Sequence, residues 1–286
     1  MNSLKFGDKI GLIAPSGNPK SFEDIEDVAN ILKQNGFIPV FNADILSQNL
    51  EEKVKNLRDF FLDSTIKAVF TLRGGFSCNE ILDLIDYSII KNNKKIFMGF
   101  SDITNLLIAF NKKSGLNTIH GPIFSEKKYL EKDVLNLLFG FLLGKIDFSD
   151  VLSKMEFKTL KSSRHAQGEL MGGNLFVLNN LIGTQYEPDW EGKILIIESV
   201  GLSQEIVLSI IEHFKQVGVF EKINGLIIGD LGNNEDFTAQ ILKKLDKFNG
   251  FILKTEHIGH VNNNYPMLIG ETVEWTGDLL KTPSHK

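Results

Sequence analysis

Residues 95–110 read KIFMGFSDITNLLIAF, and this stretch decides the fold of the first half of the chain. Its apolar run, which ends at Phe100, has the length of a buried strand, and apolar residues at helical spacing continue to Phe110. Ser101 stands at the junction, two residues after Gly99. The stretch therefore predicts a strand that turns tightly into a helix, the unit from which α/β proteins are built.

The same alternation continues on both sides of this stretch. Short apolar runs typical of strands alternate with helical patterns, and the runs lie at 9–14, 37–41, 67–72 and 117–120. Such alternation favours a parallel sheet with helices on both faces. We therefore expect residues 1–145 to form a flavodoxin- or Rossmann-like α/β domain.

A more polar stretch separates the two halves of the chain. Residues 146–167 are rich in Lys and Ser and show little apolar periodicity, which is typical of an exposed and mobile inter-domain linker. Strands are predicted again at 193–197, 225–228 and 251–255, with helices between them. We expect residues 168–286 to form a smaller C-terminal α/β domain.

The composition excludes several classes of protein. With 286 residues, 42% of them hydrophobic, and a net charge of −5, the chain is neither disordered nor a general nucleic-acid binder. Cys78 is the single cysteine, which rules out an intrachain disulfide and a multi-cysteine metal site. No apolar run approaches the roughly 20 residues that span a bilayer, and the first residues lack an apolar signal core. We expect a cytoplasmic protein with no membrane partner.

The residues that end the predicted strands are the first candidates for a functional site, because ligands bind beyond the carboxyl ends of a parallel sheet. These residues are Ser16, Arg73 with Gly74 and Gly75, Ser101 with Asp102, His120 and Glu198. A serine at such a junction can project its hydroxyl from a tight turn beside the N–H groups of a helix start, which suits a nucleophile next to an oxyanion site. Because Ile103 replaces the second glycine of a nucleophile elbow, a simple helix cap is the alternative.

A serine nucleophile needs a base, and the chain offers six histidines. Sequence position argues against His165 in the polar stretch, His213 on an amphipathic helix and His285 in the tail. His120 ends a strand and can be structural. His260 follows a strand and opens an asparagine-rich loop, where catalytic residues commonly lie, although a turn histidine is its structural alternative.

Glu198 is the candidate partner of that base. It ends the hydrophobic run 193–197, where a carboxylate is unfavourable unless it is paired or exposed. The order Ser101, Glu198, His260 is one of the chain orders of catalytic triads. The separations are so large that all pairing between the three must be tertiary.

The turn Arg73-Gly74-Gly75 can bind phosphate or offer an oxyanion N–H, or it can be a plain tight turn. It matches neither G-x-G-x-x-G nor the Walker pattern, which argues against a nucleotide site. His257 and His260 are three residues apart, but no H-E-x-x-H motif or cysteine pair supports zinc. We expect neither a metal nor an organic cofactor.

Seven segments, taken in order, resemble the serine-type LD-carboxypeptidase family, which includes the microcin C immunity hydrolases. They are GLIAPS at 11–16, RGGF at 73–76, GFSDIT at 99–104, HGP at 120–122, GELMGGNL at 168–175, IIE at 196–198, and GH at 259–260 with Pro266 and Gly270 behind it. Each is loosely specific, but all seven in order cover nearly the whole chain. The sequence departs from the family at Phe76 and Phe100, where tyrosine is frequent, and in its asparagine-rich loop after His260.

The resemblance implies roles for individual residues. Ser101 would be the nucleophile, His260 the general base and Glu198 its partner. The N–H of Asp102 and one from Gly74 or Gly75 would hold the oxyanion. The site would lie between the two domains, and a homodimer is expected. The family's typical reaction releases the terminal D-alanine of a murein tetrapeptide in the cytoplasm, during cell-wall recycling.

A carboxypeptidase must also recognise the free carboxylate of its substrate. Arg73 is the nearest candidate cation, although a structural ion pair at the glycine turn is its alternative, and Asn174 could add a neutral hydrogen bond from the other domain. Two other functions stay open. One is an immunity-type hydrolase that cuts amides of peptidyl or aminoacyl nucleotides, and the other is a non-catalytic ligand-binding module of the same fold.

Overall fold

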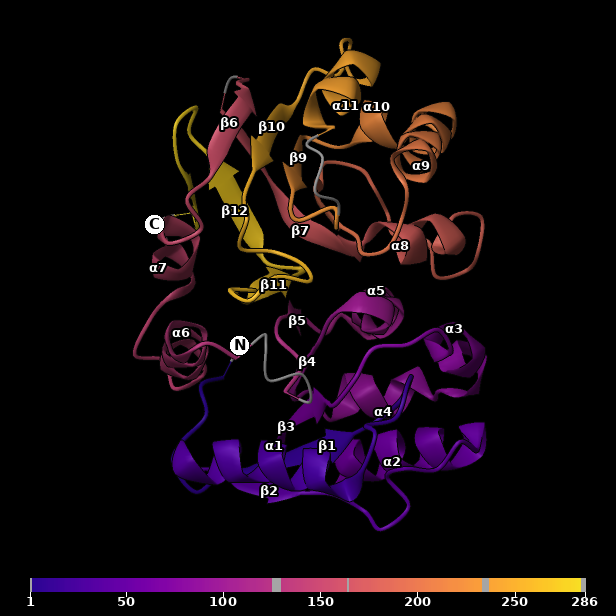
Figure 1. The fold of residues 1–286 in the computed structure, drawn as a ribbon, viewed down its shortest axis with the longest axis vertical. Coiled ribbons are helices and arrows are strands. Elements are labelled where there is room, and N and C mark those ends of the chain that lie inside the picture. Colours follow the sequence, from indigo (N-terminus) through magenta and orange to yellow (C-terminus); the bar gives the residue numbers. More distant parts are fainter. Residues whose placement is uncertain (1, 125–129, 164, 233–236, 284–286) are drawn as a thin grey trace.

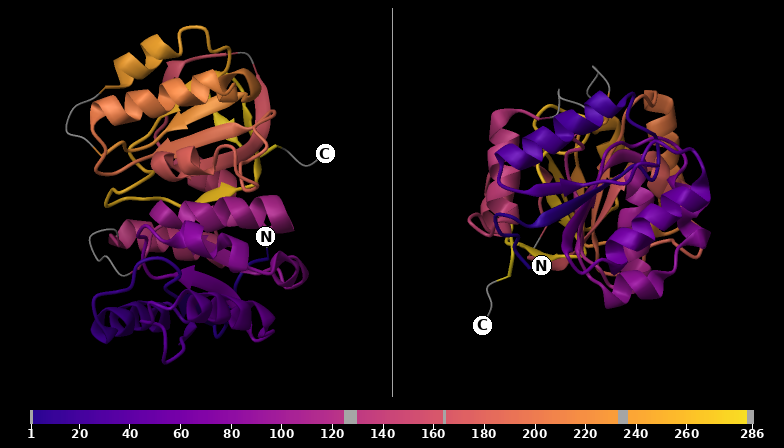
Figure 2. Two further views of the ribbon diagram at one scale, coloured as in Figure 1. Left: turned by 90° about the vertical axis from the view of Figure 1, so that its right-hand side faces the viewer. Right: turned by 90° about the horizontal axis from the view of Figure 1, so that it is seen from below.

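The structure is a computed structural model, and it describes residues 2–124, 130–163, 165–232 and 237–283. Two sheets form the cores of two stacked halves (Figure 1). The first has the strand order β11-β5-β4-β3-β1-β2, and the second has the order β13-β12-β7-β8-β9-β10-β6. Figure 2 shows the same stacking after a quarter turn.

The first half is the predicted parallel α/β unit. Five parallel strands alternate with helices, and β2, which contains Pro39, lies at the sheet edge, where a proline breaks no ladder of hydrogen bonds. The strands are β1 (Lys9–Ile13), β2 (Ile38–Val40), β3 (Ile66–Thr71), β4 (Ile96–Gly99) and β5 (Thr118–His120). The helices are α1 (Phe22–Gln34), α2 (Leu50–Leu62), α3 (Cys78–Ile81), α4 (Tyr87–Asn92), α5 (Thr104–Ser114), and the 3-10 helices η1 (Leu82–Leu84) and η2 (Ser101–Ile103).

Helix α1 shows how the local sequence builds these elements. Its N-cap residue Ser21 accepts a hydrogen bond from the backbone N–H of Asp24. Its buried face consists of the apolar residues at helical spacing: Ile25, Val28, Ala29 and Leu32. Burial of that face against the sheet stabilises the helix more than propensity alone does.

The second half is mixed rather than fully parallel. Strands β7, β8, β9 and β10 are parallel, while β6, β12 and β13 pair antiparallel at the two edges. The strands are β6 (Lys158–Lys161), β7 (Ala166–Asn174), β8 (Ile194–Glu198), β9 (Gly225–Ile228), β10 (Phe251–Lys254), β11 (Met267–Ile269), β12 (Thr272–Trp275) and β13 (Leu280–Lys281). Its helices are α7 (Phe148–Ser153), α8 (Leu175–Leu181), α9 (Gln204–Gln216), α10 (Val219–Lys222) and α11 (Thr238–Lys244). Helix α6 (Lys132–Leu142) packs on the first half instead, where the rings of Phe139 and Phe37 are 5.6 Å apart.

The segment 146–167, expected to be a linker, contains regular structure. Helix α7 begins with a capping box at Asp147, and β6 pairs antiparallel with β10. Strand β6 looks like a linker in the sequence because it is an edge strand with exposed polar side chains, a common protection of sheet edges. Arg164 lies outside the described residues.

Strand β11 crosses from the second half into the first. It pairs antiparallel with β5 and completes the first sheet, with all three of its residues buried. The C-terminal part of the chain therefore belongs to both sheets, unlike the simple division expected at residue 168. The domain boundaries themselves stay a prediction.

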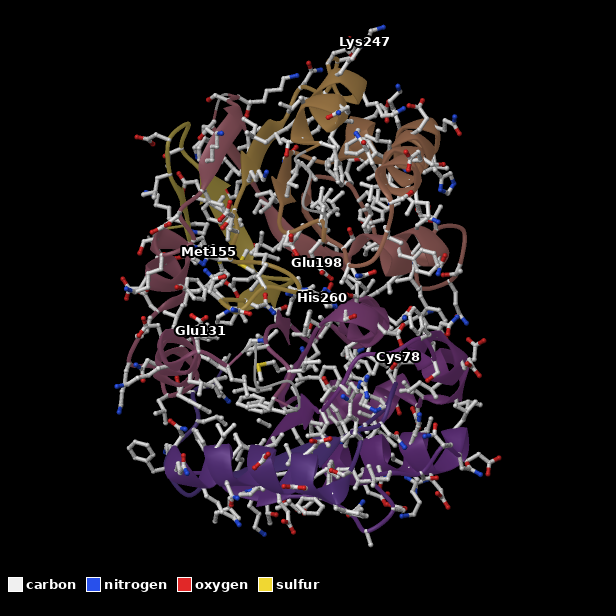
Figure 3. All side chains as sticks on the ribbon, viewed as in Figure 1. Cys78, Glu131, Met155, Glu198, Lys247 and His260 are labelled. Carbon is white, nitrogen blue, oxygen red and sulfur yellow. The ribbon has the colours of Figure 1, made fainter. Side chains whose placement is uncertain are left out.

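The two halves meet through the carboxyl ends of their strands. Gly173 near the end of β7 lies against Thr104 at the start of α5, and a Cβ on Gly173 would be 2.6 Å from Thr104 Oγ1. Figure 3 labels Glu198 and His260 at this boundary. Among the described residues, no helix is long and apolar enough to cross a membrane.

Candidate active site

Ser101 lies where the sequence predicted a tight turn between strand and helix. Its φ of 63° is in the left-handed region that residues other than glycine rarely adopt. Gly99 makes the turn sterically feasible, because a Cβ there would lie 2.2 Å from Thr71 Oγ1. Such strain, about 1–3 kcal/mol, is typical of functional sites and matches the geometry of a nucleophile elbow.

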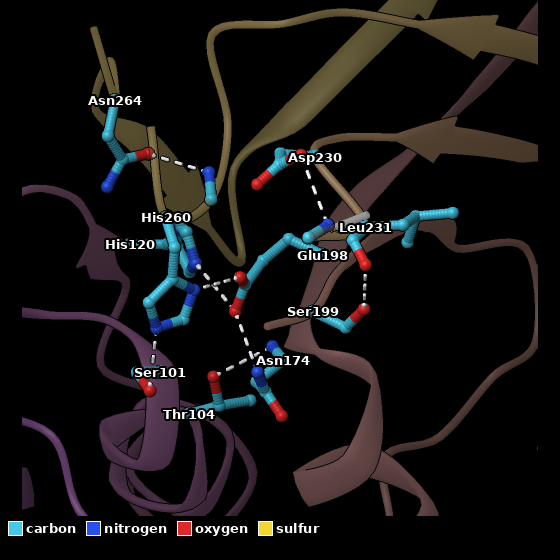
Figure 4. A network of polar contacts seen from close by, with 12 residues as sticks. Ser101, Thr104, His120, Asn174, Glu198, Ser199, Asp230, Leu231, His260 and Asn264 are labelled. Atoms are coloured by element: carbon cyan, nitrogen blue, oxygen red, sulfur yellow. Dashed lines mark hydrogen bonds and ion pairs between the residues drawn. The ribbon is translucent and has the colours of Figure 1, made fainter. Parts of the chain in front are cut away.

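Ser101, His260 and Glu198 form a continuous hydrogen-bonded chain (Figure 4). Ser101 Oγ is 3.1 Å from His260 Nε2, and His260 Nδ1 is 2.9 Å from Glu198 Oε2. Because a carboxylate only accepts, we assign the imidazole proton to Nδ1, which leaves Nε2 to accept from the serine hydroxyl. The structure thus brings together three residues that lie far apart in the sequence.

Glu198 is fully buried, and its second carboxylate oxygen, Oε1, also accepts a hydrogen bond. Asn174 Nδ2 donates to Glu198 Oε1 at 3.1 Å. Burial alone would raise the pKa of Glu198, but its interactions with His120 and His260 outweigh burial and lower the pKa to about 2. His260 makes its hydrogen bond at 2.9 Å, whereas His120 Nε2 lies 4.0 Å from the carboxylate. Glu198 is therefore ionised at neutral pH, as a partner of an imidazolium must be.

The loop after β10 places His260. Gly259 has a φ of 119°, and its N–H donates to the buried side chain of Asn264 at 3.0 Å. The ring of His260 packs against Phe100, with centroids 4.7 Å apart. The hydrogen bond to Asn264 therefore holds the asparagine-rich loop from its buried side. The side chain of His260 is 12% exposed, so a reacting group can reach it.

Gly74 lies directly against Ser101. A Cβ on Gly74 would be 2.9 Å from Ser101 Cβ and 3.6 Å from the backbone nitrogen of Asp102. Gly75 is packed against Gly17, whose N–H donates to Gly74 O at 3.0 Å. Within the described part of the chain, the N–H groups of Asp102, Gly74 and Gly75 donate no hydrogen bond, so they are available to a ligand.

The side chain of Asp102 ties three loops together behind the serine, a role that the sequence did not reveal. One carboxylate oxygen accepts from Ser16 Oγ and from the backbone N–H of Cys78, and the other accepts from Asn105 Nδ2 at 3.0 Å. These contacts join the ends of β1, β3 and β4. They fix the glycine turn relative to Ser101.

Lys53 of α2 extends this buried network. Its Nζ donates to the backbone carbonyl of Ser16, and burial lowers the pKa of the lysine despite the nearby acidic groups. The available sequence signal was a lysine on the apolar face of a helix, between Leu50 and Leu57.

Asn174 faces Glu198 rather than an open cavity. Besides its contact with Glu198, it caps α8 by accepting from the N–H of Val177, and its own N–H donates to Thr104 Oγ1 at 3.0 Å. It therefore connects the two halves at the site. Its contact with a substrate stays a prediction.

Arg73 lies on the glycine turn but is directed to the loop after β1. Its Nη1 donates to the backbone carbonyl of Asn18 at 3.1 Å. Recognition of a substrate carboxylate by Arg73 therefore stays a prediction. His285 lies outside the described residues, and among the described ones no cluster of His, Cys, Asp or Glu could hold a metal ion.

Comparisons with known proteins show similarity along most of the chain. Residues 10–121 match the model of the LD-carboxypeptidase N-terminal domain, and residues 167–275 match that of the C-terminal domain. A probable murein peptide carboxypeptidase of Bacillus subtilis is 30% identical over 81% of this chain and 74% of its own length.

Two solved structures share the fold over almost the whole chain. An MccF-like protein from Bacillus anthracis has a TM-score of 0.87 and 26% identity, and the alignment covers 99% of this chain and 98% of the other. A muramoyltetrapeptide carboxypeptidase from Oxalobacter formigenes has a TM-score of 0.79 and 21% identity, with coverage of 96% and 100%. With the two family models matching in order along more than half of its length, the chain belongs to the LD-carboxypeptidase family of peptidases.

Proposed function

We propose that the chain is a serine carboxypeptidase that removes the terminal D-alanine from a murein tetrapeptide through an acyl-enzyme, in cytoplasmic cell-wall recycling. The observation that carries the proposal is the hydrogen-bonded chain of Ser101, His260 and Glu198 in a member of this family. The Bacillus subtilis relative, whose name specifies a murein peptide, supports the substrate class.

Acylation begins at the hydroxyl of Ser101. His260 Nε2 accepts its proton while Oγ attacks the carbonyl carbon of the residue before D-alanine. Glu198 holds the tautomer of His260 and stabilises the imidazolium that forms. The imidazolium then gives its proton to the leaving amine. Water attacks the acyl-enzyme with His260 again as the base, and neither a metal nor an organic cofactor takes part in this scheme.

The negative charge that develops on the carbonyl oxygen needs hydrogen-bond donors. We assign this role to the N–H of Asp102 and to that of Gly74 or Gly75, which border Ser101 and have no internal partner in the described structure. One such donor is worth roughly 2.7–4 kcal/mol of transition-state stabilisation in comparable hydrolases. Because the Asp102 carboxylate anchors the surrounding loops, the donors are held in place before substrate arrives.

The test is release of D-alanine from a murein tetrapeptide, measured with purified protein. Ser101→Ala and His260→Ala should each abolish most turnover, and the double variant should be no worse, because the residues act as one unit. Glu198→Gln should be milder. His165→Ala, which removes an exposed histidine paired with Glu274, is the control and should keep the wild-type rate. Near wild-type turnover in Ser101→Ala would refute the serine mechanism.

Arg73 is our proposed reader of the substrate carboxylate, with Asn174 as a neutral partner. Arg73→Lys should already lower kcat/KM, because a bidentate contact is lost. Amidating the substrate C-terminus should then reduce kcat/KM much more for the wild type than for the variant. If both proteins lose equally, Arg73 does not read the carboxylate.

An immunity-type hydrolase is the second candidate, and the similarity to an MccF-like protein over 99% of the chain favours it. Such an enzyme would use the same three residues on the amide of an aminoacyl nucleotide. Comparing cleavage of an aminoacyl sulfamoyl adenosine with D-alanine release separates the two. Labelling of Ser101 by a fluorophosphonate probe, absent in Ser101→Ala, would argue against a non-catalytic binding module.

We also propose that the protein works as a homodimer on a small peptide, without nucleic acid or membrane as a partner. The family resemblance supports the dimer, and the acidic net charge of −5 disfavours nucleic acid. Light scattering of the purified protein at several concentrations measures the oligomeric state. A mass of one chain, 32.1 kDa, at all concentrations would contradict the dimer.

A further inference from the structure

His120 is a buried histidine that lies beside His260, and both face the Glu198 carboxylate (Figure 4). It ends β5, where its backbone is paired with Gly99 of β4 on one side and with Met267 of β11 on the other. The side chain is fully buried, and its ring lies edge-on to Phe100 with centroids 5.8 Å apart. The imidazole is therefore held rigidly between the two halves of the molecule.

The ring nitrogens of His120 have no hydrogen-bond partner within the described structure. A buried polar atom without a partner is unfavourable by about 1–3 kcal/mol, so its presence needs an explanation. The charged group that Nε2 faces is the Glu198 carboxylate, whose Oε1 lies 4.0 Å away. That separation leaves no room for a bridging water and is about 1 Å longer than a hydrogen bond.

The Glu198 carboxylate thus faces two histidines, one with each oxygen. Oε2 accepts from His260 Nδ1, and Oε1 accepts from Asn174 Nδ2 and faces His120. We infer that His120 is a positioning residue of the site: its Nε2–H is directed at Glu198 Oε1 and, together with Asn174, holds the carboxylate in the rotation in which Oε2 meets His260. The inference deepens the proposed function and, where it concerns turnover, rests on it.

The interaction between His120 and Glu198 predicts how loss of His120 would change the protonation of His260. A donor at Oε1 draws negative charge away from Oε2, whether His120 is neutral or protonated, and so weakens the pull of Glu198 on the proton of His260. Without His120, more charge lies on Oε2, and the imidazolium of His260 is favoured. The base would then be protonated up to a higher pH.

The other charged groups near Glu198 and His260 are the same in wild type and in the His120 variants. Asp230, at the start of the loop after β9, is close enough for its charge to interact with both Glu198 and His260, and burial raises the pKa of Asp230. Glu256 acts on Asp230 in turn. These carboxylates are present in wild type and variants alike, so they do not account for a difference between them.

The first test needs neither a variant nor a substrate. Nitrogen-15 NMR of the imidazoles in the wild-type protein shows which ring nitrogen carries the proton. The inference requires that Nε2 of His120 be protonated at neutral pH. An Nδ1–H tautomer with a bare Nε2 would overturn it, because two acceptors cannot hydrogen-bond to each other.

The second test compares His120→Phe, which keeps the ring volume and loses the donor, with His120→Gln, which restores an N–H. The exchange rate of the downfield His260 Nδ1–H proton with water reports how often the hydrogen bond to Glu198 opens. Although Oε2 carries more charge without His120, the carboxylate is free to rotate away from His260, so this proton should exchange faster in His120→Phe than in wild type, and His120→Gln should restore slow exchange. His257→Phe is the matched control, because His257 also has a buried unpartnered nitrogen but packs on Tyr265 instead of facing Glu198. Unchanged exchange in a folded His120→Phe would overturn the inference.

Turnover supplies the third readout. His120→Phe should lower kcat/KM about 10–100-fold, by analogy with residues that orient metal-binding side chains through a hydrogen bond. In His120→Phe, the acidic limb of the pH profile of kcat/KM should also move to higher pH. In His120→Gln, it should return towards its wild-type position. A purely structural role would lower stability and leave the limb in place. Because the NMR readouts use protein without substrate, a wrong substrate assignment would abolish only the kinetic result.

Discussion

Ser101, the proposed nucleophile, has an unfavourable backbone conformation. Because its φ is 63°, alanine at this position keeps the strain, whereas glycine relieves it. We expect Ser101→Gly to be about 1 kcal/mol more stable than Ser101→Ala, although both are inactive. Urea denaturation of the two variants measures this difference. Equal stabilities would mean that the loop around residue 101 relaxes once the hydroxyl is gone.

Glu198 links stability to pH. Although burial opposes it, the neighbouring histidines lower its pKa from 4.5 to about 2, so folding stabilises the ionised form. This contribution is fully present above about pH 4.5 and is lost as the pH falls towards 2. The free energy of unfolding of wild type should therefore fall over that window by a few kcal/mol more than that of Glu198→Gln.

Chemical denaturation at a series of pH values measures both curves. If the two proteins lose stability in parallel below pH 4.5, Glu198 is not ionised in the folded state with the lowered pKa assigned to it.

At the scale of elements, the end of β7 is a tight contact between the two halves. Gly173 has a φ of 140°, and a Cβ there would meet Thr104 Oγ1 at 2.6 Å. Gly183 has a φ of 78° but no neighbour within 4 Å of such a Cβ. Gly183→Ala should cost about 1–2 kcal/mol from the backbone alone, and Gly173→Ala should cost more and reduce turnover.

Unfolding free energies of the two variants, measured side by side, check this expectation. A smaller loss in Gly173→Ala than in Gly183→Ala would show that the junction between the halves is soft enough to open for a methyl group.

Elements with a strong apolar pattern were predictable from the sequence, and those without one were not. The strand before Ser101 and the helix after it were found because apolar residues alternate abruptly with a turn. Strand β6 was missed because an exposed edge strand has the composition of a linker. Strand β11 is only three residues long, and its partner β5 lies about half a chain away, so no local signal assigns it to the first sheet.

Like the secondary-structure elements, the site could be predicted only in part from the sequence. Ser101, Glu198 and His260 each end a strand or follow one, which made them candidates, but their convergence depends on tertiary packing that spacing does not encode. The anchoring role of Asp102 escaped the sequence because its partners, Ser16, Cys78 and Asn105, come from separate segments. The role inferred for His120 is visible only from its distance to Glu198.

At the scale of the whole molecule, the first sheet depends on a strand from the other end of the chain. Without β11, strand β5 would expose an unpaired apolar edge, which favours aggregation. Residues 1–145 expressed alone should therefore aggregate or stay partly unfolded. Size-exclusion chromatography and circular dichroism check this, with the full chain as the control. A monomeric fragment with cooperative unfolding would contradict the expectation.

Because β11 returns to the first sheet, the site can assemble only late in the synthesis of residues 1–269. Translation delivers the first sheet early, and N-terminal domains generally begin to fold while the ribosome is still at work. Here the last strand of that sheet, Met267–Ile269, is translated only after the loop that carries His260. A nascent chain therefore holds an incomplete first sheet, and a Ser101 without His260, until residues 260–269 have been made, so the topology itself delays assembly of the proposed site.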